Sequence, residues 1–246
     1  MNLRSILFTA TILVSAFFIS CGQAQSPAKA DLPLVTKPIN YNAWQEEAKT
    51  NIRLLPKYGN LPKNEQQKEA DNKLISRYEK QEGTRHKGSE LLINQGFKYL
   101  YNGDIKTAMY RFNQAWLLDS TNTDIYWGYG SVYFYLKQYQ LAMEQYDEGL
   151  RINPENSKII TDKATLHMIA YQMNNEASKL KEAITLFNKS YALDQKNQNT
   201  LFKLSVSYFL DNNCKKARLY YDECVKLGGE PITPEYTQAL NEKCKD

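Results

Sequence analysis

Three observations in the sequence predict an all-α fold made of repeated pairs of helices. Residues 123–156 directly follow residues 89–122 and repeat their pattern. In both copies a small residue, an aromatic residue, an alanine and a second aromatic residue recur in phase. Turn-forming residues, YNGD at 101–104, divide the first copy into two halves. A repeat of this length indicates stacked helix hairpins, because a single hairpin cannot bury its apolar face alone.

The recurring residues have clear packing roles. Small residues are needed where helix backbones approach closely, aromatic residues fill the wedge between helices, and a proline ends the second helix. The first copy carries Gly96, Tyr99, Ala108, Phe112 and Ala115, and the second carries Gly130, Tyr133, Ala142, Tyr146 and Gly149, followed by Pro154. This pattern resembles the tetratricopeptide repeat (TPR). The resemblance implies a right-handed α-solenoid of about four TPR hairpins, at residues 89–122, 123–156, 157–197 and 198–231.

The third repeat contains an insertion. Ala183 and Phe187 occupy marker positions seven residues later than the period requires. Seven residues are close to two turns at ~3.6 residues per turn, so the insertion can lengthen the hairpin while the same faces stay packed. The fourth repeat restores the period with Ser205, Tyr208, Ala217, Tyr221 and Cys224.

Helical segments are predicted on both sides of the repeats. In residues 41–88, Asn64 and Gln67 have the spacing of a capping box, and Gly83 can end the helix that they begin. We interpret residues 41–88 as a helical N-terminal segment that caps the first repeat. In residues 232–246, Thr233 and Pro234 are the expected N-cap and first residue of a C-terminal capping helix.

The N-terminus has the features of an export signal. Residues 1–20 combine an early basic residue with an apolar stretch too short for a membrane span. The FISC stretch that ends at Cys21 resembles the lipobox of bacterial lipoproteins, which implies cleavage before Cys21 and acylation of this residue as a lipid anchor. Gly22 in place of Asp then points to the outer membrane, with residues 21–40 as a flexible tether. The alternative is an ordinary secretory signal cut after Ala24, which would leave a soluble periplasmic or secreted protein.

Three cysteines lie close to the C-terminus, and export to an oxidising compartment favours a disulfide. In an antiparallel hairpin, residues equidistant from the turn lie opposite one another, and Cys214 and Cys244 are equally far from Gly229 in the sequence. Cys224 lies ten residues, or ~15 Å, from Cys214 along one helix, which is too far for a bond. We therefore predict a Cys214–Cys244 disulfide with Cys224 as a buried thiol. The alternative is three reduced, buried cysteines.

Composition and motifs argue against several function classes. The 31 basic and 27 acidic side chains are interspersed, which disfavours a nucleic-acid partner. The sequence has no glycine-rich phosphate loop, paired-cysteine zinc pattern or nucleophile elbow, and His86 and His167 have no partner at motif spacing. We therefore expect no enzyme activity, no metal and no cofactor.

A surface for protein binding is the remaining prediction. In the TPR family the first helix of each repeat lines a groove that commonly binds an extended peptide or a partner helix. Helical spacing places aromatic side chains in this groove, namely Phe97, Tyr101, Trp127, Phe134, Tyr135, Phe202 and Phe209. If these side chains are exposed, they form a larger apolar surface than a lone soluble domain tolerates, which is typical of a binding site. The alternative is that these side chains pack within the array or under residues 41–80.

The whole sequence resembles TPR lipoproteins of the Bacteroidetes type. This resemblance implies a non-catalytic scaffold, tethered in the cell envelope, that binds a protein or peptide partner in the aromatic groove. One rival is an assembly factor for an envelope complex. Another is a glycan- or peptidoglycan-binding module, because aromatic grooves also stack on sugars.

Overall fold

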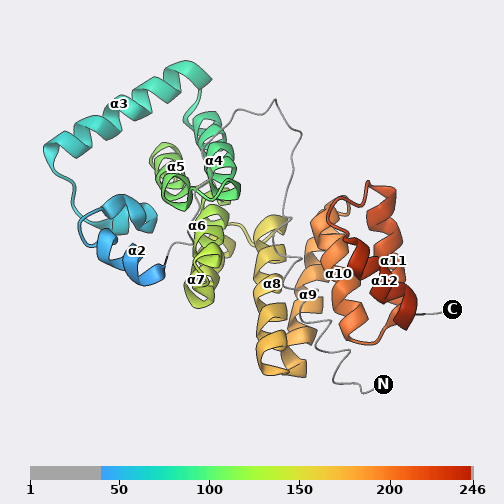
Figure 1. Cartoon of the computed structure of the whole chain (residues 1–246). Helices are drawn as coiled ribbons and strands as arrows, with labels where there is room; N and C mark the ends of the chain where they lie inside the picture. Colours follow the sequence, from blue (N-terminus) through green and yellow to red (C-terminus); the bar gives the residue numbers. More distant parts are fainter. Residues whose placement is uncertain (1–39, 245–246) are drawn as a thin grey trace. The chain divides into compact units, whose positions relative to one another are not determined.

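The computed structural model describes residues 40–244, and the regular elements in this range are all helices (Figure 1). They belong to two compact units, one ending at Ile159 and the other beginning at Ile160. The predicted signal peptide, Cys21 and the predicted tether up to residue 39 lie outside the described residues. Between residues 40 and 244, no helix is both long enough and apolar enough to cross a membrane. The prediction of an all-α fold is confirmed.

The N-terminal unit consists of a capping segment followed by two hairpins. The capping segment comprises α2 (Tyr41–Ala48), two short 3-10 helices (Ile52–Leu54 and Pro56–Asn60) and α3 (Glu65–Glu82). The hairpins are α4 (Arg85–Tyr101) with α5 (Ile105–Leu118), and α6 (Asp124–Tyr135) with α7 (Tyr139–Ile152). The two helices of each hairpin pack on one another, and α6 also packs on α4 and α5.

Local signals determine where α3 and α4 begin and end. The predicted capping box is present, because the side chains of Asn64 and Gln67 each accept a hydrogen bond of 2.9 Å from the backbone N–H of the other. Gly83 follows α3 at a φ of 79°, a left-handed conformation that costs a glycine little. Thr84 then caps α4 by accepting a hydrogen bond of 3.2 Å from the N–H of Lys87.

Glycines allow the hairpins of the N-terminal unit to approach closely. The Phe112 ring lies between Gly96 of α4 and Gly128 of α6, where an added Cβ would come within 2.4 Å and 2.5 Å of ring atoms. Tyr146 of α7 contacts Gly130 of α6 in the same way, at 2.1 Å from such a Cβ. These distances exclude any side chain at the glycine positions unless the rings move. The recurring aromatic residues therefore act as wedges against recurring small residues.

The C-terminal unit contains α8 (Ser157–Asn174) from Ile160 onward, followed by α9 (Ala177–Leu193), α10 (Gln198–Leu210), α11 (Cys214–Lys226) and α12 (Pro234–Lys243). The helices α8 and α9 have 18 and 17 residues, compared with 13 in each of α10 and α11. The insertion has thus lengthened both helices of this hairpin. Thr233 caps α12 by accepting a hydrogen bond of 3.3 Å from the N–H of Tyr236, and Pro234 is the first helical residue, as predicted.

Buried polar bonds connect the first three helices of the C-terminal unit. The hydroxyl of Thr161 in α8 lies 2.7 Å from that of Ser190 in α9 and 2.7 Å from that of Thr200 in α10. The ammonium of Lys203 in α10 donates a hydrogen bond of 2.7 Å to the hydroxyl of Thr165 in α8. These bonds satisfy polar groups that would otherwise be costly to bury.

Candidate interaction face

Four aromatic side chains of the N-terminal unit lie along two neighbouring helices. Phe97 and Tyr101 are one turn apart on α4, and Trp127 and Phe134 are two turns apart on α6. The ring centroid of Phe97 lies 5.9 Å from that of Tyr101 and 4.0 Å from that of Trp127, so rings of both helices are in contact. We call these four residues the aromatic face.

Exposure differs along the aromatic face. Phe97 is 8% exposed and forms its floor, whereas Tyr101 at its edge is 39% exposed. Phe134 is half-buried, with its ring centroid 5.7 Å from that of Tyr139 in α7. Tyr135, the next residue on α6, is 40% exposed. The face therefore combines a packed base with one exposed ring, that of Tyr101, and the exposed ring of Tyr135 lies beside the face in the sequence.

A cation and its partners hold the Trp127 end of the face. The ammonium of Lys158 lies 5.2 Å from the Trp127 ring centroid and donates a hydrogen bond of 2.5 Å to the carboxylate of Asp124. The side-chain amide of Asn156 donates to the same carboxylate at 2.8 Å and to the hydroxyl of Thr123 at 2.9 Å. This end of the face is thus polar and carries a positively charged group beside an aromatic ring, a favourable arrangement.

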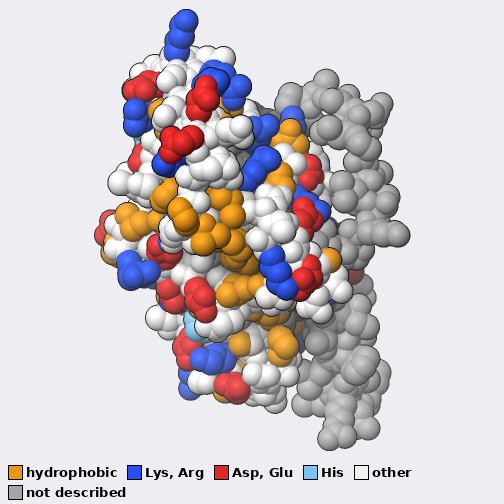
Figure 2. Space-filling view, turned by 90° about the vertical axis from the view of Figure 1, so that its left-hand side faces the viewer, with side chains coloured by type: hydrophobic (Ala, Val, Ile, Leu, Met, Phe, Trp, Pro, Cys, Tyr) orange, Lys and Arg blue, Asp and Glu red, His pale blue; other side chains and the backbone are white. Residues whose placement is uncertain are grey.

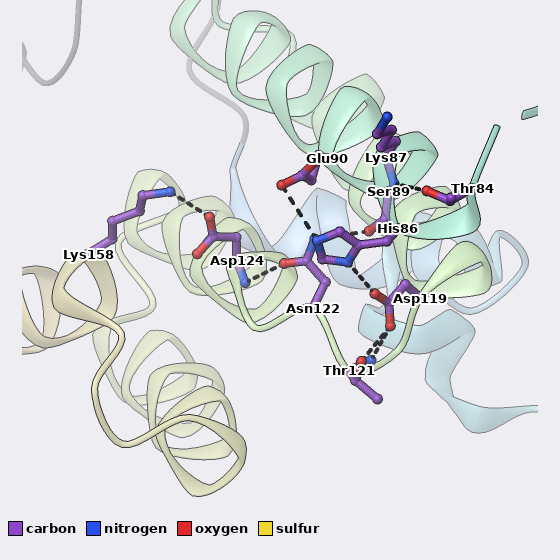
Figure 3. A network of polar contacts seen from close by, with 10 residues as sticks. All are labelled: Thr84, His86, Lys87, Ser89, Glu90, Asp119, Thr121, Asn122, Asp124 and Lys158. Carbon is purple, nitrogen blue, oxygen red and sulfur yellow. Dashed lines mark hydrogen bonds and ion pairs between the residues drawn. The ribbon is translucent and has the colours of Figure 1, made fainter. Parts of the chain in front are cut away.

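The loop between α5 and α6 is attached to α4 by a second set of polar contacts (Figure 3). The His86 ring lies between two carboxylates, with Nδ1 at 2.6 Å from Asp119 and Nε2 at 3.6 Å from Glu90. The hydrogen bond with Asp119 raises the pKa of His86 above its ordinary value. Burial opposes ionisation of Asp119, but hydrogen bonds from Thr121 and His86 outweigh it and lower the pKa of this carboxyl.

One of these contacts recurs in the next repeat. The amide of Asn122 donates to the hydroxyl of Ser89 at 3.4 Å, and the amide of Asn156 donates to the hydroxyl of Thr123. The two asparagines are one full repeat apart in the sequence, and so are the two hydroxyl residues. Neither this contact nor the partners of His86 were predicted from the sequence. The period itself was the available signal, because a polar residue that recurs once in each repeat is placed to bond across neighbouring repeats.

Residues 51–60, which we call the strap, contact residues of α5 and α6 that are not members of the aromatic face. The strap contacts Tyr110 and Asn113 of α5 and Tyr129 of α6. Tyr129 is two residues beyond Trp127, which corresponds to about 200° around the helix, so the two side chains point to opposite sides of α6. The alternative that the aromatic side chains pack under residues 41–80 stays a prediction, because these contacts concern residues 51–60 alone.

Figure 2 shows the side of the molecule on which α2 and α3 are drawn in Figure 1. Lys and Arg side chains alternate there with Asp and Glu, and hydrophobic side chains gather in the middle of the view. Leu61, directly after the strap, is 48% exposed. This view contains no large surface of a single charge.

Two predicted groove residues lie elsewhere. Phe202 and Phe209 of α10 are 2% and 9% exposed and belong to the core of the C-terminal unit. Their ring centroids lie 5.5 Å and 5.8 Å from that of Tyr236 in α12. The capping helix α12 therefore packs on the side of α10 that carries these rings. This corrects the prediction that Phe202 and Phe209 line an open groove.

The cysteines of the C-terminal unit lie in two different settings. The structure joins Cys214 and Cys244 in a disulfide, with their Cα atoms 5.2 Å apart. Cys224 is a buried free thiol, and burial raises its pKa to about 11. Within residues 40–244, no three His, Cys, Asp or Glu side chains are grouped so that they could hold a metal ion.

Comparison with known proteins identifies the repeat. The family model described as "Tetratricopeptide repeat" matches residues 123–156, the second predicted repeat. The human protein "Tetratricopeptide repeat protein 6" is 26% identical over 81 residues, which are 33% of this chain and 16% of the human protein. The match thus spans only a small part of that relative's length.

Two solved structures share the fold. A thermophilic TPR protein of Thermus thermophilus, TTC0263, has a TM-score of 0.53 at 14% identity, covering 63% of this chain and 80% of its own. PilF of Pseudomonas aeruginosa has a TM-score of 0.50 at 16% identity, over 65% and 73% of the two chains. At these identities the likeness concerns the fold alone. Together with the wedges of aromatic rings against glycine, it defines a protein built from repeated helix hairpins. The chain thus contains a tetratricopeptide repeat at residues 123–156, within a fold that it shares with TPR proteins.

Proposed function

We propose that this chain is a non-catalytic scaffold that binds a peptide or a partner protein on its aromatic face. Stacked helical repeats form extended surfaces that serve mainly to bind other proteins. The observation that carries the proposal is the row of rings across α4 and α6, with Phe97 as its floor and Tyr101 at its exposed edge. Aromatic residues of this kind supply much of the binding energy at protein interfaces.

The contacts of Trp127 favour a peptide over a glycan. Its ring is tilted by 38° against the ring of Phe97 and lies beside the ammonium of Lys158, so part of its surface is already in contact with protein. Stacking on a sugar would require a broad, accessible ring face. A peptide can instead use the edge of Tyr101, the hydroxyl groups of the tyrosines and the cation at the end of the face.

We further propose that the scaffold is held at the outer membrane by acylation of Cys21. The lipobox-like stretch before Cys21 and the residue after it support this localisation. Acyl chains contribute ~0.8 kcal/mol for each buried CH₂ group, so more than one chain gives a stable anchor without a membrane-spanning helix.

Site-specific photocrosslinking tests the proposed face. A photoreactive phenylalanine analogue at Tyr101 is expected to form covalent adducts with the partner in membranes of the source organism. The same analogue at Ser76, on α3, a helix that contributes no residue to the aromatic face, serves as the control and is expected to form none of these adducts. Adducts of equal yield from both positions, or from Ser76 alone, would contradict the assignment of the face.

Truncation of exposed rings provides a second measurement. The variant Tyr101→Ala/Tyr135→Ala is expected to weaken capture of the crosslinked partner by roughly tenfold or more, because interface aromatic residues are often worth about 2 kcal/mol or more. Its melting temperature should fall by only a few degrees, since both rings are partly exposed. Leu219→Ala, at a side chain 50% exposed in the C-terminal unit, is the matched control and should leave capture unchanged. A large loss of melting temperature with full capture would show that the rings are structural.

A further inference from the structure

The strap is held by a pair of side chains that bind its backbone. The side-chain amide nitrogen of Asn113 donates hydrogen bonds to the backbone carbonyls of Arg53 at 2.8 Å and of Leu55 at 2.9 Å. The amide oxygen of Asn113 accepts a hydrogen bond of 2.7 Å from the hydroxyl of Tyr129. This hydroxyl in turn accepts a hydrogen bond of 3.1 Å from the backbone N–H of Lys57. Asn113 thus bonds to α6 and to the strap at the same time.

These bonds lie in the interior of the N-terminal unit. Asn113 and Tyr129 are both 0% exposed, and Leu54, between the two carbonyls that Asn113 binds, is also 0% exposed. Removing one partner from a buried network leaves polar groups without bonds, so its members depend strongly on one another. The strap is therefore part of the packing between the two repeats of this unit.

Further contacts attach the strap to both hairpins. The amide of Asn51 donates to the hydroxyl of Tyr110 in α5 at 2.8 Å, and the guanidinium of Arg53 lies 3.7 Å from the centroid of the same ring. The ammonium of Lys57 donates to the carboxylate of Glu148 in α7 at 2.6 Å. The strap consequently bridges α5 of the first repeat with α6 and α7 of the second.

The end of the strap has a backbone conformation that needs outside support. Lys57, Tyr58, Gly59 and Asn60 have φ values of 56°, 57°, 66° and 54°. Left-handed conformations are unfavourable for residues other than glycine, so three of these four residues depend on their contacts to remain there. Buried Tyr58, with the Lys63 ammonium 3.3 Å from its ring centroid, contributes to that support.

A chain of aromatic rings connects the strap to the aromatic face. The ring centroid of Tyr129 lies 6.4 Å from that of Phe112, and the Phe112 centroid lies 5.1 Å from that of Phe97. Phe97 then contacts Trp127. Phe112 is the ring enclosed between Gly96 and Gly128, so the place of this ring limits how closely α4 and α6 can approach one another.

We propose that the strap positions the aromatic face, with Asn113 and Tyr129 as positioning residues. By fixing Tyr129 against α5, the strap holds Phe112 in its place and thereby sets the separation of α4 and α6 on the opposite side. A binding surface that is already arranged binds more tightly, because less ordering is required on association. The functional meaning of this coupling rests on the proposed function of the aromatic face, but the coupling itself is a property of the free protein.

Hydrogen exchange of the full chain, followed by mass spectrometry, tests the coupling without a ligand. Tyr129→Phe keeps the ring and removes the hydroxyl that bonds Lys57 and Asn113. We expect amides of residues 51–58 to exchange roughly tenfold faster, and amides of residues 96–101 and 127–133 at least about threefold faster. Residues 139–152 and the C-terminal unit should keep their protection.

Two further variants make the result decisive. Ala142→Gly, inside α7 and outside the contacts described above, should accelerate exchange in α7 and leave the strap unchanged. Asn51→Ala removes the bond from the strap to Tyr110 of α5 and changes no residue of α7 or of the ring chain, and it replaces Tyr129→Phe if that variant does not fold. Faster exchange in the strap with unchanged exchange at 96–101 and 127–133 would overturn the proposal, and so would a uniform acceleration that includes α7. Either result concerns the coupling alone, whereas the crosslinking experiment tests the face.

Discussion

Contacts between aromatic rings and glycine backbones determine how closely the helices of the N-terminal unit approach one another. A Cβ at Gly130 would lie 2.1 Å from an atom of the Tyr146 ring, and the Phe112 ring excludes a Cβ at both Gly96 and Gly128. At each of these three positions the helices can approach this closely only because glycine has no side chain. The recurrence of glycine and aromatic residues in the sequence therefore reflects pairs of positions that can change only together.

Gly130→Ala tests this dependence. Alanine normally stabilises a helix by up to about 1 kcal/mol relative to glycine, but here overpacking against Tyr146 should reverse the sign. We expect a net loss of about 1–3 kcal/mol in the free energy of unfolding, measured by urea denaturation. Tyr146→Leu should recover part of this loss in the double variant, because the two changes share one contact. Additive effects of the two substitutions would contradict the wedge model.

The contact between His86 and Asp119 predicts a pH dependence near neutrality. The hydrogen bond with Asp119 raises the pKa of His86, and Glu90 also faces the ring. A raised pKa in the folded state stabilises the fold below the unfolded pKa of about 6.5, and this stabilisation is lost as the pH rises through the folded pKa. The free-energy difference between the parent chain and His86→Gln should therefore shrink from pH 6 to pH 8.

The size of this effect is limited by solvent. The His86 side chain is 59% exposed, so we expect the change to be less than about 1 kcal/mol. Urea denaturation of both proteins at three pH values measures it. Asp119→Asn removes the main partner and should weaken the same pH dependence, leaving the smaller part due to Glu90, whereas a difference that grows toward pH 8 would contradict the assignment.

At the scale of helices and hairpins, the features that could be predicted depend on residues close together in the sequence. The capping box joins Asn64 to Gln67 within the first turn of α3, and Gly96 and Phe112 belong to the two helices of one hairpin. Caps follow from local hydrogen bonding, and the wedge pairs follow from the period. The insertion in the third repeat could be interpreted for the same reason, because it is close to a whole number of turns.

Contacts between distant segments could not be predicted in this way. Asn113 binds carbonyls that lie 58 and 60 residues earlier, and neither periodicity nor a motif connects it to the strap. Phe202 and Phe209 obey the same spacing rule as Phe97, but α12 packs against them. Helical spacing shows which side chains of a repeat's first helix point toward the first helix of the neighbouring repeat. It does not show whether a helix covers them.

The capping helix α12 provides a prediction at the same scale. The bond between Cys214 and Cys244 closes a loop with a sequence separation of 30 residues, and loop entropy assigns it roughly 3–4 kcal/mol. Cys214→Ser/Cys244→Ser should therefore lower the free energy of unfolding by about this amount and increase hydrogen exchange first in α12. Arg218, which donates to the carbonyl of Cys244 at 3.0 Å and 2.7 Å, should retain part of the docking.

Peptide mapping of the unreduced protein is the chemical check on this pairing. A peptide that links Cys214 with Cys244 is expected. Cys224 should be alkylated only after unfolding, because burial raises the pKa of its thiol to about 11 and keeps it protonated at neutral pH. The control Cys224→Ala should leave the linked peptide intact. A linkage that contains Cys224 would contradict the pairing.

At the scale of the whole chain, the two compact units have different features. The N-terminal unit carries the aromatic face and the strap, and the C-terminal unit carries the disulfide and the capping helix. The proposed anchor at Cys21 precedes both sets of helices in the sequence. In our proposal the repeats bind the partner, and the acylated N-terminus determines where in the cell this binding takes place.

This separation predicts the behaviour of Cys21→Ala. Without the thiol that would be acylated, the protein should leave the membrane fraction of the source organism and appear in the soluble fraction. The melting temperature of the repeats should be unchanged, because the predicted tether of residues 21–40 separates Cys21 in the sequence from the helices that begin at Tyr41. Cys224→Ala, which removes a buried thiol in α11, is the matched control and should remain in the membrane fraction. A high-salt wash distinguishes acylation from electrostatic adsorption, since exposed charges are screened by salt and acyl chains are not. If Cys21→Ala still sediments with membranes after the wash, the anchor assigned to this cysteine is wrong.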